Sequence, residues 1–133
     1  MEFLNETTYV DQAEKVIDDL KAPYEKNGKT IHPQLVTTSK IRNILSMAAD
    51  LYDNVLQNRN NELSADIVSR IEYLRVRMIY ESGRETLVKS FVTRAHLDEY
   101  AKMIGNDKKK YILFYRYLEA LVAFHKFKGG KDN

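Results

Sequence analysis

The sequence predicts an all-α protein, a single-domain helical bundle of about five helices, and three observations lead to that prediction. Both prolines lie before residue 37, and the five glycines leave long stretches without a helix breaker. Apolar residues recur every three or four positions along most of the chain. Segment 111–127 is apolar around nearly its whole circumference, so other helices must enclose it.

Length and charge set the limits for this bundle. A chain of 133 residues forms one domain, 1–133, and buries roughly two thirds of the surface that its unfolded form exposes. Segment 1–36 carries four lysines against seven acids, whereas segment 37–133 carries seventeen bases against twelve acids. There is no cysteine, no leader and no apolar run long enough for a bilayer, so we expect a cytoplasmic protein without a membrane partner.

The N-terminal quarter is predicted to be an acidic helix followed by a long loop. A helix from about residue 8 to 21 has one apolar and one acidic side. Segment 22–36 contains Pro23, Asn27-Gly28 and Pro33 and has no helical period, so it is predicted to be a connection. Loops of this length are often functional.

Segment 37–127 is predicted to be the helical core. Thr37-Thr38-Ser39 offers hydroxyls for the first turn of a helix that continues to about residue 57. Ser64 caps a third helix, which should end in a left-handed conformation at Gly83. The short polar turn between these helices predicts an antiparallel pair.

The remaining segments predict a break and a final helix. Segment 85–104 reverses its apolar face near residues 94–97, which predicts a bend or break there, or two faces that contact different bodies. Gly105-Asn106-Asp107 should end this segment and cap the helix that follows. The tail, 128–133, is expected to be disordered.

Arrangements typical of enzymes are missing from the sequence. The three histidines lie in separate elements, and no zinc, phosphate-loop or dinucleotide motif occurs. His125 lies on the apolar side of the last helix, which favours a core histidine over a catalytic one. We therefore expect no catalytic residue, no metal site and no cofactor.

The basic residues suggest a different function. Arg70, Arg77 and Arg84 recur every seven residues, and Tyr73 and Tyr80 lie about 50° to one side of that line. Guanidinium groups pair with phosphates and tyrosines stack on bases, so this stripe suits single-stranded or irregular RNA. The alternative, which we weigh equally, is a solvated face in which Arg77 pairs with Glu81 and Arg70 with Asp66.

Two further basic features have competing interpretations. Arg75 lies within the apolar arc of its helix and needs a partner, for which Glu119 is predicted. A structural ion pair is favoured over an RNA contact. Three lysines at a helix start oppose the helix dipole, and a phosphate bound there would relieve that cost. A solubilising loop cluster is the alternative for them. The expected RNA contacts are Lys40, Arg42, Arg70, Tyr73, Arg77, Tyr80, Arg84, Lys108, Lys109 and Lys110.

Three segments together resemble a known family. The run 35–45 (LVTTSKIRNIL), the turn 78–84 (MIYESGR) and the helix 114–127 (FYRYLEALVAFHKF) look like the small subunit of type III-A CRISPR effector (Csm) complexes. The resemblance implies a small all-α protein without catalytic activity that serves in antiviral defence. It also implies its partners: guide RNA, target RNA, stacked copies of itself, and the backbone and large subunits of the complex.

Two other classes remain open from the sequence alone. A helical adaptor that binds only protein would leave the basic residues solvated. A DNA-binding helical protein would place an arginine-rich helix after a tight turn. Binding to RNA, to duplex DNA or to neither separates the three.

Overall fold

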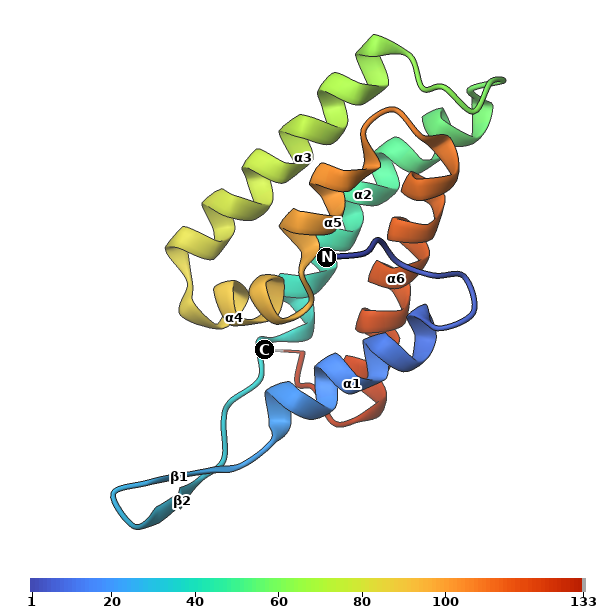
Figure 1. Cartoon of the computed structure of the whole chain (residues 1–133). Coiled ribbons are helices and arrows are strands. Elements are labelled where there is room, and N and C mark those ends of the chain that lie inside the picture. Colours follow the sequence, from blue (N-terminus) through green and yellow to red (C-terminus); the bar gives the residue numbers. More distant parts are fainter. Residues whose placement is uncertain (133) are drawn as a thin grey trace.

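The computed structural model describes residues 1–132, and this part of the chain holds six helices and one short hairpin (Figure 1). The prediction of a helical bundle is confirmed as a mainly helical fold with one helix more than expected. The elements are α1 (Tyr9–Lys21), β1 (Tyr24–Lys26), β2 (Lys29–Ile31), α2 (Thr38–Gln57), α3 (Ala65–Arg84), α4 (Thr86–Arg94), α5 (Leu97–Ile104) and α6 (Lys108–Phe127).

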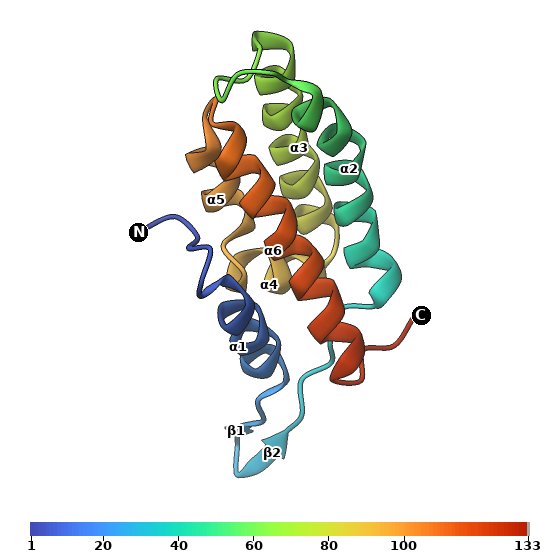
Figure 2. The ribbon, with the colours of Figure 1, turned by 90° about the vertical axis from the view of Figure 1, so that its right-hand side faces the viewer.

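Four helices form the body of the bundle. Helix α2 packs between α3 and α6, and α5 packs on the opposite side between the same two helices. Successive members run in alternating directions, as Figure 1 shows. Helix α4 closes one end against α3 and α5, and α1 lies along α6 (Figure 2). The apolar stripes of all these helices therefore face a single core.

Helix α6 is enclosed by its neighbours, as its apolar circumference predicts. Its phenols are tied into the core, since Tyr111 Oη donates to the carbonyl of Ala48 (2.5 Å) and Tyr117 Oη to that of Ala95 (3.0 Å). Burial raises the pKa of both phenols above the ordinary value of 10.0. Seven of its side chains are buried: Tyr111, Leu113, Phe114, Tyr117, Leu118, Leu121 and His125.

The chain breaks between α4 and α5, where a bend or break is predicted. His96 adopts the left-handed conformation (φ 57°), so the helix cannot continue through it. The break turns α5 back along the bundle, and Phe91 before it and Leu97 after it both point into the core. The two opposed apolar faces are thus buried within one molecule. They need no second body to cover them.

Helix ends follow the sequence in two places and depart from it in two others. Ser64 Oγ accepts from the backbone N–H of Ile67 (3.3 Å), and Asp107 Oδ1 accepts from that of Lys110 (3.2 Å), as expected. The prediction of a left-handed helix end at Gly83 is wrong. Helix α3 continues through this residue to Arg84, and the chain then turns at Glu85, which has an extended conformation. Thr37 begins α2 without a side-chain cap, since its hydroxyl meets that of Ser39 (3.3 Å) instead.

The long connection 22–36 contains a hairpin that the sequence analysis did not predict. Asn27 (φ 53°) and Gly28 (φ 77°) form the two-residue turn between β1 and β2. Positive φ at both positions matches the twist of a tight hairpin. The hairpin projects away from the bundle (Figure 1).

Residues 128–132, for which disorder is expected from the sequence, make defined contacts with α1 and α2, and Asn133 lies outside the described residues. The carbonyl of Lys131 accepts from the backbone N–H of Thr38 (2.8 Å). Lys128 Nζ pairs with Glu14 (2.9 Å) and Asp18 (2.8 Å) on α1. The tail therefore contacts the start of α2 and the middle and later part of α1, which its glycine-rich composition did not indicate.

His125 joins this tail to the core, so its expected structural role is confirmed. Its ring is fully buried, Nε2 donates to the carbonyl of Val36 (2.6 Å), and Nδ1 lies 3.4 Å from the hydroxyl of Thr38. A carbonyl only accepts, so Nε2 carries the proton and Nδ1 is free to accept. A Cβ on Gly130 would lie 2.1 Å from the ring, so only glycine fits there.

Acidification should destabilise the protein through this histidine. Burial lowers the pKa of His125 below the ordinary 6.5, so the unfolded chain binds a proton that the folded ring resists. The stabilisation is complete above the unfolded pKa and is lost as the pH falls. Urea unfolding at about pH 7.5 and about pH 5 measures this. In His125→Gln the loss between the two pH values should be smaller, and an equal loss would contradict the assignment.

Candidate nucleic-acid interface

One exposed side of α3 carries the arginine and tyrosine stripe. We call it the α3 face and define it by Arg70, Tyr73, Arg77, Tyr80 and Arg84. Residues seven apart lie nearly one above the other on a helix, so the arginines form one line. The two tyrosine side chains are 63% and 55% exposed, a large aromatic area for a solvent-facing helix. The structure therefore brings together five of the ten predicted residues.

Tyr80 organises the lower half of this face. The guanidinium carbons of Arg77 and Arg84 lie 5.6 Å and 5.7 Å from the centre of its ring. Glu81 forms ion pairs with both arginines at 3.5 Å. The pairing of Arg77 with Glu81, proposed as the solvated alternative, is therefore present. Exposed pairs of this kind contribute about 0–1 kcal/mol, so a phosphate can displace the carboxylate.

The upper half of the α3 face borders a groove between α2 and α3. Arg70, Tyr73 and Arg77 line it together with Met47 and Asp50, and its volume is about 360 Å³. No ion pair joins Arg70 to Asp66 among the described residues, so this half of the solvated alternative is wrong. A guanidinium beside an aromatic ring and a groove has the chemistry to hold a phosphate and a base together.

Lys40 and Arg42 lie on different sides of α2. Lys40 Nζ pairs with Glu85 (2.5 Å), just after the end of α3, so it lies close to Arg84. Arg42 is about 200° further around α2. Its charge instead reaches Asp132 in the tail, where it helps Lys126 to lower the pKa of that carboxyl. Arg42 is therefore separate from the α3 face.

The three lysines at the start of α6 do not form the predicted phosphate site. Lys108 Nζ donates to the carbonyls of Leu56 and Asn58 at the end of α2. Lys110 Nζ lies 5.5 Å from the ring centre of Phe3, which leaves Lys109 as the exposed side chain of the three.

The backbone N–H groups of this first turn are also occupied. The partners are Asn61 for Lys108 and Lys109, and Asp107 for Lys110 and Tyr111. A phosphate would find no free backbone N–H group in this turn. The ammonium of Lys108 lies at the carbonyl end of α2, where a positive charge is stabilised by the dipole of that helix. This contact gives Lys108 a structural role that needs no ligand.

Arg75 does not pair with Glu119, contrary to the sequence prediction. Its Nε donates to Asp98 (3.1 Å) and its Nη1 to Glu72 (2.8 Å). Helix α5 lies between α3 and α6, so the partner comes from α5, while Glu119 points to solvent. These two carboxylates raise the pKa of Arg75 against the opposing effect of burial, which is the largest single influence.

Sequence reasoning missed an apolar extension of the α3 face. Val76 is 57% exposed and Ile79 is 53% exposed. They follow the tyrosines around the helix on the side away from the arginines. The buried arc of α3 is centred between Leu74 and Met78, and Ile79 lies about 120° away from that centre. The positions of α2, α4 and α5, which all pack against α3, determine which arc of the helix is covered.

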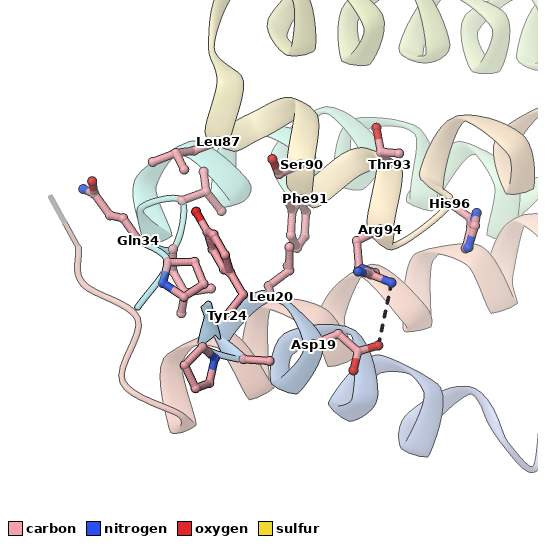
Figure 3. Close-up of a pocket in the computed structure, with 15 residues that line it drawn as sticks. Asp19, Leu20, Tyr24, Gln34, Leu87, Ser90, Phe91, Thr93, Arg94 and His96 are labelled. Atoms are coloured by element: carbon pink, nitrogen blue, oxygen red, sulfur yellow. Dashed lines mark ion pairs between the residues drawn. The ribbon is translucent and has the colours of Figure 1, made fainter. Parts of the chain in front are cut away.

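A larger cavity lies elsewhere, where α1, the hairpin connection and α4 meet (Figure 3). Its volume is about 790 Å³, with Leu20 and Phe91 in its wall. Arg94 and Asp19 approach to 4.0 Å at one end, and the His96 ring is engaged by Glu99 at 2.9 Å. Asp19 and His96 in this cavity are therefore held in separate pairs, Asp19 with Arg94 and His96 with Glu99.

Two further features concern the described residues as a whole. These residues hold no group of three or more His, Cys, Asp or Glu side chains close enough to bind a metal ion. None of their helices combines the length and apolar character needed to cross a membrane.

The fold and the α3 face together define a class: a small, mainly helical protein whose most distinctive surface is an exposed arginine and tyrosine face on one helix. Comparison with known proteins specifies the family. A family model described as Csm2 Type III-A matches residues 14–131. The chain therefore belongs to the Csm2 family of type III-A CRISPR systems, which confirms the resemblance seen in the sequence.

Curated relatives, each named CRISPR system Cms protein Csm2, are similar over nearly their whole length. The Streptococcus thermophilus protein is 42% identical over 132 residues, covering 99% of this chain and 100% of the relative. The Mycobacterium tuberculosis protein is 42% identical over 124 residues, 93% of this chain and 94% of the relative. The Enterococcus italicus protein is 34% identical over 119 residues, 86% and 85%.

Proposed function

We propose that the chain is a non-catalytic structural subunit of a type III-A CRISPR effector complex and that it binds guide and target RNA through the α3 face. The observation that carries this proposal is the gathering of Arg70, Arg77 and Arg84 with two exposed tyrosines on one helix side. The proposed role is antiviral defence in the cytoplasm. Membership of the Csm2 family supports it.

RNA binding would use charge and stacking rather than base reading. The guanidinium groups pair with phosphates, and Tyr73 and Tyr80 offer ring faces or hydroxyls to bases and riboses. Arg77 and Arg84 are already positioned by Tyr80, so little side-chain entropy is lost when a phosphate replaces Glu81. All these contacts tolerate any sequence, which suits a subunit that accompanies variable guides.

The proposed protein partners are other copies of the chain and the backbone and large subunits of the complex. The apolar faces of α4 and α5 are buried within the bundle, so they offer no surface on which another copy could stack. Val76 and Ile79 remain as an exposed apolar edge beside the RNA face. If copies stack along RNA, mass measurement on RNAs of increasing length should show the number bound rising in steps, whereas a constant one or two copies would contradict stacking by the isolated subunit.

Filter binding of the purified chain tests the proposal. We expect binding to single-stranded RNA that weakens steeply with salt and varies little with sequence. Preference for a duplex DNA site would favour a DNA-binding protein instead.

A protein-only adaptor is the second candidate function. Val76 and Ile79 favour it, because exposed apolar side chains on a helix are typical of protein contacts. The absence of RNA binding at both low and moderate salt would support this candidate and overturn the first.

A further inference from the structure

A second basic site shares no residue with the groove beside the α3 face and lies where the hairpin connection meets the tail. We call it the tail cavity; its volume is about 410 Å³. No acidic side chain lines it, whereas each of the four other cavities described here has one: Asp19, Asp50, Glu6 or Glu62. Its lining consists of Lys21, His32, Pro33, Gln34, Leu35, Thr37, Lys128, Gly129 and Lys131.

Three segments that are distant in the sequence build this cavity. Lys21 at the end of α1 donates through Nζ to the carbonyl of Lys128. The carbonyl of Lys131 is fixed by the backbone N–H of Thr38 (2.8 Å). These bonds hold the walls in place, so the cavity exists before any ligand arrives.

The charges that remain available come from two walls. The ammonium of Lys128 is engaged by Glu14 and Asp18 on α1, so it contributes little attraction. The side chains of Lys131 and His32 form no hydrogen bond or ion pair with any described residue. Lys21 and Lys131 therefore place positive charge in the lining of a cavity without an acid, and the ring of His32 and the hydroxyl of Thr37 line the same cavity.

We propose that the tail cavity binds a phosphate group. A compact anion with several oxygens can accept from the ammonium of Lys131, the ring of His32 and the hydroxyl of Thr37 at once. The planar fork that favours a carboxylate is absent, because no arginine lines the cavity. This site goes beyond the α3 face and does not rest on it. The phosphate can belong to an RNA strand or be free in solution.

Titration of the full chain with inorganic phosphate at constant ionic strength, followed by amide NMR, tests the proposal. Saturable shifts are expected at Thr37, Gly129 and Lys131. The variant carrying His32→Ala and Lys131→Ala should bind phosphate about tenfold or more weakly. The matched control Lys102→Ala, an exposed lysine on α5, should bind as the wild type does. Absence of saturable shifts in the wild type would overturn the proposal, as would unchanged binding in the folded double variant.

A second arm distinguishes the source of the phosphate. If the site takes an RNA phosphate, the double variant should also show a salt slope for RNA binding that is smaller by about 0.7. An unchanged slope beside a lost phosphate titration assigns the site to free phosphate. The phosphate titration should persist when Arg70, Arg77 and Arg84 are all alanine, so failure of the α3 proposal is measured separately.

Discussion

Leu118→Asp unfolds the protein in this account. The side chain is 2% exposed in the middle of α6, where the neighbouring helices meet. An unpaired carboxylate buried there costs several kcal/mol, against a total stability of about 5–15 kcal/mol for a domain of this kind. Circular dichroism should show loss of helix at room temperature, or a melting point lower by many degrees.

Ala123→Asp provides the matched control. It lies five residues further along α6, on the exposed side, so it introduces the same charge into solvent. Its melting point should stay close to that of the wild type. Val122→Asp should fall between the two, because Val122 is only partly buried. A wild-type melting curve for Leu118→Asp would show that α6 is not central.

Combined replacement of Arg70, Arg77 and Arg84 by alanine should weaken RNA binding for every sequence. Each lost phosphate contact removes about 0.7 from the slope of log affinity against log salt on a single strand, so the slope should fall by about 2. The fold should be retained, since all three side chains lie on the surface of α3. Affinity measured at several salt concentrations gives both quantities.

The control for this variant removes the same charge elsewhere. Arg59, Lys89 and Lys102 are exposed on other parts of the molecule, and their joint replacement by alanine also removes three positive charges. If both triple variants lose affinity equally, net charge explains the binding and the α3 face has no special role. If neither loses affinity, the stripe is a solvated surface.

Features encoded locally were predictable from the sequence. Ser64 and Asp107 cap their helices because a short polar side chain can reach the backbone two or three residues ahead in the same turn. The break near His96 was visible because the apolar face changes sides there. The arginine and tyrosine stripe depends only on the helical repeat within α3, so the sequence was sufficient to predict that these side chains share one face.

Features that depend on distant segments were not predictable. The partner of Arg75 is Asp98 because α5 turns back after the break, and no pattern within α3 contains that information. The backbone N–H groups at the start of α6 are occupied because the loops at 58–64 and 105–107 contact each other through Asn61 and Asp107. The sequence alone does not show this contact. The composition of the tail predicts disorder, yet glycine is required at Gly130, where the chain passes the ring of His125.

The most direct test of the central claim is ultraviolet crosslinking of the chain to RNA within the assembled effector complex, followed by identification of the crosslinked residues. Exposed aromatic rings that stack on bases are efficient crosslinking partners, so the account predicts adducts on Tyr73 and Tyr80. Their yield should fall when the three arginines of the α3 face are replaced. Crosslinks confined to other elements, with residues 70–84 unmodified, would contradict the account.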